Sequence, residues 1–276
     1  MDRTADIAVL RARLARAELT DREGQSRATL GHAPADACLG GGILRGALHE
    51  IFPASAGDEA AAGGFAAALA ARVAASARVL WLRTDFAALE HGEISPLGLL
   101  ELGLDPARFL LLRAPDATSV LRAASDALSC TALGALMIEI PGAPKILDLS
   151  ASRRLVLAAA QSGVSAFLLR LDAQPEASAA ETRWLIRAAR SHAPSARFAG
   201  TSPASGGGKG RAEPGLGDWG CPRFDAEMVR HRHGRTGHWV MEWSCDDGIF
   251  RAADSGAVVS ASPDRPAAAK NARRIA

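Results

Sequence analysis

The chain has 276 residues and a formal net charge of +2, and 48% of its residues are hydrophobic. This length suits one large α/β domain with extensions or two small domains, and the hydrophobic content excludes a wholly disordered chain. A charge so near zero argues against a protein coated in basic surface for nucleic acid, but leaves a local basic patch open.

Lysine is rare, because 29 arginines stand beside only Lys145, Lys209 and Lys270. Chemistry that needs a lysine therefore has three candidates. The four cysteines include no C-x-x-C pair, which argues against a zinc site or a redox motif. The N-terminus shows no signal peptide, and the longest weakly polar run, 60–71, is shorter than the roughly 20 apolar residues that a membrane span needs. We expect a soluble, cytoplasmic protein.

The N-terminal residues 2–20 carry Ile7, Leu10 and Leu14 at helical spacing. They predict a short amphipathic helix that must pack on something, because alone it would be marginal. Polar, glycine-rich residues follow. We therefore expect an N-terminal helix and arm over 1–39, one main domain over 40–253 and a disordered tail over 254–276.

The main domain begins with a regular alternation of apolar runs and helical patterns. Strands with continuous apolar runs that alternate with helices indicate a parallel sheet covered on both faces. The predicted strands are 47–52, 78–82, 109–112, 135–140 and 164–171, and the predicted helices are 64–76, 96–102, 117–129 and 150–162.

The rhythm breaks over 174–222, which holds one apolar stretch at 182–189. From Phe224 the period changes to two, which predicts an antiparallel hairpin over 224–243 and a short edge strand at 249–252. The Trp239 and Trp243 side chains share one face, which favours a place in the core over a base-stacking platform. The predicted fold class is α/β, with a largely parallel sheet flanked by helices and a C-terminal antiparallel hairpin.

The loop after the first strand occupies the place of a phosphate-binding P-loop, G-x-x-x-x-G-K-[ST]. Here Gly57, Asp58, Glu59 and Ala60 close it, without the lysine or the hydroxyl. At an effective dielectric constant near 20, unit charges about 4 Å apart interact by about 4 kcal/mol, so carboxylates should abolish tight triphosphate binding. We expect a loop that keeps its place in the fold but does not bind nucleotide. Its carboxylates would interact favourably with the positive N-terminal end of the following helix. The glycine-rich stretch around Lys209 has no strand before it and is typical of a linker.

Two other carboxylates occupy places where nucleotide enzymes need them. Glu139 ends the fourth predicted strand, where P-loop enzymes hold Mg²⁺, and Asp85 follows the second, where a general base would stand. Without the lysine and the hydroxyl, we expect Glu139 to be structural, and the same objection applies to Asp85. No Ser/His/Asp or Cys/His arrangement is legible.

The hairpin carries the densest polar signal. Arg230 and Arg232 share one face by the period of two, and Arg235 lies in the turn. Two interpretations stay open: a solvated arginine-rich strand and turn, or a strip that contacts phosphates or a partner's carboxylates. The neighbouring histidines lack the context of a metal site.

Three segments resemble the RecA-fold ATPase core. Residues 41–52 (GGILRGALHEIF) resemble the segment that enters its P-loop, residues 99–109 (LLELGLDPARF) resemble the segment before its third strand, and residues 230–237 (RHRHGRTG) are similar to its basic hairpin. In this comparison Glu59 and Ala60 stand at the lysine and hydroxyl positions. Thr84 or Asp85 stands at the glutamate that polarises the attacking water.

Degenerate RecA-like chains of this length resemble the ImuA family, accessory proteins of the SOS-induced mutagenic cassette. The pattern Arg-x-Arg-x-Gly…Trp-x-x-Glu-Trp, from Arg230 to Trp243, fits that family. The resemblance implies a non-catalytic protein without a cofactor or metal. Its implied partners are an ImuB-like protein, an error-prone DnaE-type polymerase and, as a further candidate, RecA. The alternatives are a SulA-like cell-division inhibitor, a DNA-binding module and a residual ATPase.

The resemblance also suggests a docking hypothesis. In RecA-fold assemblies, basic residues on the first hairpin strand reach the nucleotide of the neighbouring subunit. Arg230 and Arg232 would then dock this chain on an ATP-bearing RecA protomer. The N-terminal residues Ile7, Leu10 and Leu14 would add a subunit contact.

Overall fold

The structure, a computed structural model, describes residues 26–189 and 221–253. The predicted N-terminal helix with Ile7, Leu10 and Leu14, the glycine-rich stretch around Lys209 and the predicted tail all lie outside the described residues.

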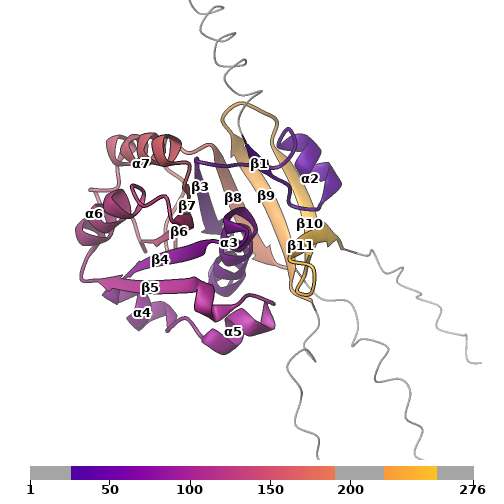
Figure 1. The fold of residues 1–276 in the computed structure, drawn as a ribbon, viewed down its shortest axis with the longest axis horizontal. Coiled ribbons are helices and arrows are strands. Elements are labelled where there is room, and N and C mark those ends of the chain that lie inside the picture. Colours follow the sequence, from indigo (N-terminus) through magenta and orange to yellow (C-terminus); the bar gives the residue numbers. More distant parts are fainter. Residues whose placement is uncertain (1–25, 190–220, 254–276) are drawn as a thin grey trace, which may run out of the picture.

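In the described residues, nine strands form one mixed sheet in the order β11-β10-β9-β8-β3-β7-β6-β4-β5 (Figure 1). The strands from β8 to β5 are mutually parallel, and β9, β10 and β11 add to β8 in antiparallel fashion. The predicted α/β architecture is therefore confirmed. The bounds of these strands are β3 Leu48–Pro53, β4 Arg78–Thr84, β5 Phe109–Ala114, β6 Leu133–Glu139, β7 Ser165–Leu169, β8 Thr182–Ala188, β9 Arg223–His231, β10 Gly237–Ser244 and β11 Ile249–Ala252.

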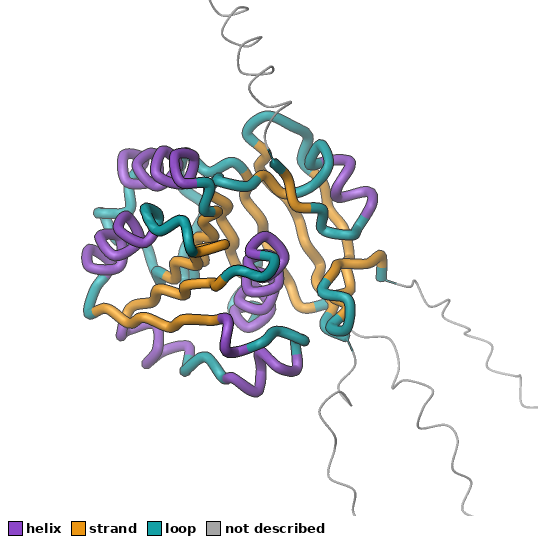
Figure 2. Tube along the Cα trace, in the orientation of Figure 1, coloured by secondary structure: helices purple, strands orange, loops and turns teal. Residues whose placement is uncertain are grey.

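Helices cover both faces of the parallel part, as the tube in Figure 2 shows. Side chains of each strand alternate between two cores, so that Met137 and Phe167 pack under α3 while Leu136 and Leu168 face α6 and α7. The helices are α2 Ala33–Cys38, α3 Glu59–Ala74, α4 Asp85–His91, α5 Pro96–Glu101, α6 Ala117–Ala127 and α7 Leu149–Ser162, with a 3₁₀ turn at Pro106–Arg108.

Helix α3 differs from its prediction because it starts at Glu59 and not at Gly64. Its N-terminal half is built from Ala and Gly, which give little contrast between a polar and an apolar face. Phe65 anchors the helix in a cluster of aromatic rings from β8, β9 and β11. The helix directly after the candidate phosphate loop is thus buried along most of its length.

The first described residues pack on the same sheet. The short strands β1 (Arg27–Ala28) and β2 (Ile43–Leu44) pair with each other, and α2 between them contacts β10. Leu30 and Leu39 are buried in the core that contains α3. Part of the segment predicted as an arm therefore belongs to the core.

Strand β8 was only an apolar stretch in the sequence. It lies between β3, to which it is parallel, and β9, to which it is antiparallel, so it joins the hairpin to the parallel sheet. Arg183 in β8 pairs with the buried Glu50 of β3 at 2.7 Å. Arg183 and Arg170 also lie over the Phe52 ring.

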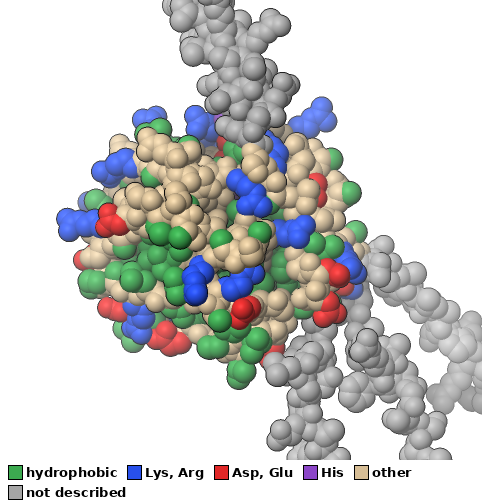
Figure 3. Space-filling view, viewed as in Figure 1, with side chains coloured by type: hydrophobic (Ala, Val, Ile, Leu, Met, Phe, Trp, Pro, Cys, Tyr) green, Lys and Arg blue, Asp and Glu red, His purple; other side chains and the backbone are tan. Residues whose placement is uncertain are grey.

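Strand β5 forms the open edge of the sheet, and Leu110, Leu111 and Leu112 on it are exposed. Figure 3 shows hydrophobic side chains reaching the surface in this part of the molecule, with arginines spread over the rest of that face. Exposed edges of this kind favour association with another chain. In the described ranges, no helix has the length and apolar character to cross a membrane.

Candidate functional site

The loop between β3 and α3 lies at the carboxyl ends of the parallel strands, where open α/β sheets bind ligands. Its backbone is tied to β8 by the Ala54 N–H, which donates to the Ile186 carbonyl at 2.9 Å. Gly57 adopts a φ of +96°, a left-handed conformation that suits glycine. The loop is thus kept in the place where a P-loop would stand.

The loop carboxylates accept hydrogen bonds from donors of the loop and of β8. Asp58 accepts from the Ser55 hydroxyl through one oxygen and from the Ala188 N–H through the other, at 2.9 Å. Glu59 accepts from the Gly57 N–H at 2.8 Å. Asp58 stands at the N-cap of α3 but its side chain makes no capping bond there. Partial burial acts to raise the pKa of Asp58, but the hydrogen bonds from Ser55 and Ala188 outweigh it and hold that pKa below its ordinary value.

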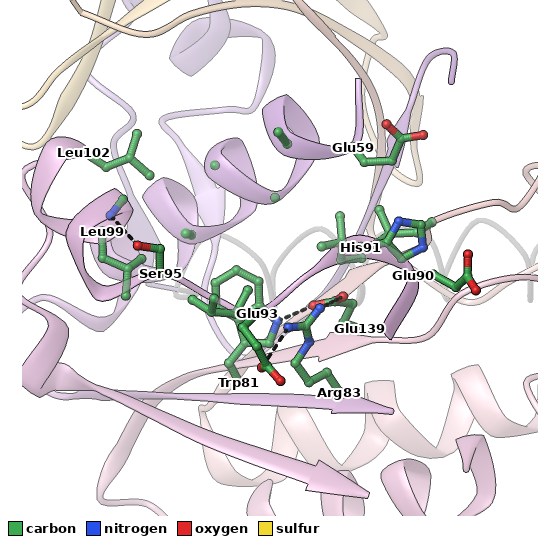
Figure 4. Close-up of a pocket in the computed structure, with 18 of the residues that line it drawn as sticks. Glu59, Trp81, Arg83, Glu90, His91, Glu93, Ser95, Leu99, Leu102 and Glu139 are labelled. Carbon is green, nitrogen blue, oxygen red and sulfur yellow. Dashed lines mark hydrogen bonds and ion pairs between the residues drawn. The ribbon is translucent and has the colours of Figure 1, made fainter. Parts of the chain in front are cut away.

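The Glu139 carboxylate at the end of β6 is buried and fully engaged. It accepts from Arg83 Nη2 at 2.7 Å and from Trp81 Nε1 at 2.9 Å. Figure 4 shows Arg83 and Glu139 pointing toward each other below the cavity. Asp85 instead lies at the surface, where its carboxylate pairs with Arg113 at 3.1 Å. Both carboxylates that resembled catalytic positions are therefore bound to arginines.

A cavity of about 560 Å³ lies between α3 and the α4–α5 segment, above Trp81 and Arg83 (Figure 4). The carboxylates that line it belong to Glu59, Glu90, Glu93 and Glu139, and Arg83 is the arginine among its lining residues. Because the excess charge is negative, this cavity repels a polyphosphate.

The site has few groups for nucleotide chemistry. No lysine is among the described residues that line the cavity, and Ala60 stands at the hydroxyl position of the resembled motif. In the part of the chain that the structure describes, no cluster of three His, Cys, Asp or Glu side chains could hold a metal ion.

The predicted arginines lie on the far side of the sheet from this cavity, at the amino-terminal end of β8. Arg230 Nη1 donates to the Ser178 carbonyl at 2.7 Å, and the Arg232 N–H donates to the Glu181 carbonyl at 2.8 Å. Both side chains line one cavity of about 400 Å³ beside α7. Arg235 is exposed in the turn, and its carbonyl accepts from Cys38 Sγ. The structure brings Arg230 and Arg232 together and leaves Arg235 apart from that cavity.

Two features of the site were not predicted from the sequence. The first is Arg83 as the partner of Glu139, since 56 residues separate them. The second is Arg153 on α7, which lines the cavity of Arg230 and Arg232. The sequence of α7, on which Arg153 lies, does not predict that this helix packs beside the hairpin.

The fold and the loop define an α/β protein with a largely parallel sheet, whose loop after β3 carries Glu59 and Ala60 where the resembled phosphate-loop motif has its lysine and hydroxyl. Proteins named "Protein ImuA" from two strains of Caulobacter vibrioides are each 32% identical to this chain over 228 residues, which cover 78% of this chain and 82% of theirs. The chain belongs to the ImuA family. No family model matches it.

Proposed function

We propose that this protein is a non-catalytic accessory protein in DNA-damage-induced (SOS) mutagenesis and translesion synthesis. Its membership of the ImuA family supports the process. The observation that carries the non-catalytic role is the loop after β3, in which the carboxylates of Asp58 and Glu59 accept from the Ala188 and Gly57 N–H groups.

The loop argument is electrostatic. A P-loop binds phosphate because its backbone N–H groups point at an anion and a lysine adds charge. Here the Glu59 carboxylate accepts from the Gly57 N–H and the Asp58 carboxylate accepts from the Ser55 hydroxyl. A triphosphate at this loop would therefore meet two negatively charged carboxylates. The Mg²⁺-binding role of Glu139 would require breaking its bonds to Arg83 and Trp81.

Equilibrium titration with a fluorescent ATP analogue and Mg²⁺ tests this part. We expect no saturable binding up to about 1 mM, where binding free energy is only about 4 kcal/mol. Micromolar affinity would overturn the non-catalytic role and favour the residual ATPase. The variant Asp58→Gly/Glu59→Lys/Ala60→Thr, which rebuilds the motif, shows whether the backbone of the loop can still accept phosphate.

The protein would act by contacts with an ImuB-like protein and an error-prone DnaE-type polymerase, with RecA as a further candidate, and would need no cofactor of its own. The cavity that holds Arg230 and Arg232 supports a contact surface on this side of the molecule. Deletion of the gene should abolish most damage-induced mutation, and a plasmid copy should restore it. An Arg230→Ala/Arg232→Ala copy should be made at normal levels yet fail to restore it.

A DNA-binding module is the second candidate, favoured by the same arginines. If they meet DNA phosphates, affinity for an oligonucleotide must fall steeply with salt. A mobility-shift titration at two salt concentrations separates this from protein docking. Cell filamentation on overproduction would instead favour the SulA-like alternative.

A further inference from the structure

The cavity beside α7 has a third arginine that sequence reasoning did not place there. Its walls include Arg153 from α7 together with Arg230 and Arg232 from the hairpin, and its volume is about 400 Å³. We call it the α7–hairpin cavity. Three arginines, one from α7 and two from the hairpin, therefore line one cavity.

The positive charge of this cavity is not balanced by the described residues. None of the described residues that line it carries a carboxylate. Arg230 donates to a backbone carbonyl, and the Arg153 and Arg232 side chains form no hydrogen bond or ion pair with any described residue. The nearby carboxylate of Glu181 faces His231 and His233 at 3.6 and 3.8 Å. No described carboxylate therefore pairs with these arginines.

Apart from Ser178, the remaining described lining residues are apolar. Leu149, Val156 and Leu157 line the cavity from α7, on the same face as Arg153. Leu157 is 61% exposed, although the opposite face of the helix is buried through Leu155 and Ala159. Helix α7 therefore presents a second apolar stripe to solvent, next to the arginines.

We propose that the α7–hairpin cavity binds an acidic segment of a partner protein, with carboxylates on Arg153, Arg230 and Arg232 and an apolar side chain against Leu157. Guanidinium groups suit phosphate and carboxylate alike. The apolar wall decides between them, because a phosphate chain would gain nothing from covering Leu157, whereas an amphipathic peptide would. This inference rests on the proposed function, in which the protein acts through protein contacts.

A photo-crosslinking residue in place of Leu157 tests the occupant directly. The probes are the purified ImuB-like protein and DnaE-type polymerase of the same genome, and mass spectrometry identifies the crosslinked segment. We expect a segment that carries several Asp or Glu residues beside an apolar one. A crosslink into a neutral or basic segment, or no crosslink to a partner that binds the full chain, overturns the proposal.

Affinity measurements with matched variants separate the contributions. Arg153→Glu should weaken partner binding at least about tenfold, the loss of one charged contact. Arg154→Glu, the neighbouring exposed arginine outside this cavity, should change it by less than about twofold. Leu157→Ser should weaken partner binding and leave binding of single-stranded DNA unchanged.

The outcomes distinguish the two proposals. If the unaltered chain binds neither partner, the proposed function fails and this inference fails with it. If the unaltered chain binds a partner, and the Arg153→Glu and Arg154→Glu variants bind that partner with equal affinity, only the assignment of the partner to this cavity is wrong. Loss of DNA binding in Arg153→Glu, with partner binding intact, would assign the cavity to phosphate and contradict the acidic segment.

Discussion

The Arg83 guanidinium and the Glu139 carboxylate form an ion pair with 2.7 Å between Nη2 and Oε1, and each side chain is only 2% exposed. Arg83 also donates to the carbonyls of Ala87 and Gly92. The pair thus joins β6 to the α4 segment at the floor of the candidate site. A carboxylate at the position where P-loop enzymes hold Mg²⁺ has become part of the scaffold.

Replacement of Arg83 by Met should lower the free energy of unfolding by about 3–5 kcal/mol, because it leaves the buried Glu139 charge without its partner. Urea unfolding followed by circular dichroism measures this loss. The double variant Arg83→Met/Glu139→Leu should recover much of it. Arg113→Met, which breaks exposed pairs with Asp85 and Glu93, should cost no more than about 1 kcal/mol. Equal losses for Arg83→Met and Arg113→Met would contradict the role of the buried pair.

The pKa of Asp58 gives a pH-dependent prediction. Its folded-state pKa lies below the ordinary value, because the bonds from Ser55 and Ala188 outweigh the effect of burial. This carboxylate therefore stabilises the fold above the ordinary pKa, and the contribution is lost as the pH falls through the lower folded-state pKa. Asp58→Asn should cost about 1–2 kcal/mol at pH 7. The gap to the unaltered chain should narrow below about pH 4, and a constant gap across this range would contradict the prediction.

His49 predicts a second loss of folding stability with falling pH, in a higher pH range than that of Asp58. Burial lowers the pKa of its imidazole from 6.5 to about 4. Nε2 donates to the Leu44 carbonyl and Nδ1 accepts from Thr182, which fits a neutral ring. As the pH falls below 6.5, the unfolded chain gains a proton that the folded chain does not, so folding should weaken by about 3 kcal/mol between pH 6.5 and 4. A His49→Gln variant should lose this slope in unfolding experiments, and an unchanged slope would place the titration elsewhere.

Two glycines form a matched pair for backbone strain. Gly103 has a φ of +68° and a Cβ there would overlap the Cys245 carbonyl, whereas Gly57 has a φ of +96° with open space around it. Gly57→Ala should cost about 1–2 kcal/mol from the left-handed backbone alone, and Gly103→Ala about 3 kcal/mol or more. Thermal unfolding of both variants checks the order. The reverse order would show that the turn at Gly103 can move away from Cys245.

Strands β6 and β7 could be predicted because each carries a continuous apolar run that is buried on both faces of the sheet. Helix α4 (Asp85–His91) could not, since seven residues that begin directly at a strand end carry no clear period. Strand β8 was not predicted as a strand because its buried positions include Thr182 and Arg183. Their polar groups are satisfied by His49 and Glu50, partners that lie more than 130 residues away.

In the candidate site, too, some features follow from the local sequence and others depend on contacts between distant segments. The missing lysine and hydroxyl at Glu59 and Ala60 are local facts of the sequence. That Asp58 binds Ala188 is not local, because 130 residues separate the two and the fold of β8 beside β3 brings them together. The same holds for Arg153, whose place beside Arg230 depends on how α7 lies against the hairpin.

The bond from the Ala188 N–H to Asp58 has a consequence for timing. Proteins that bind and hydrolyse a nucleotide alternate between a nucleotide-bound and a nucleotide-free state. The loop that binds the phosphates takes part in setting how long the bound state lasts. On the proposed function, a loop whose carboxylates accept from Gly57, Ser55 and Ala188 would have no nucleotide-bound state to alternate with. On the proposed function, the protein would work from the moment it folds until it is degraded, so the cell would limit mutagenesis through the number of copies it makes and the rate at which it removes them.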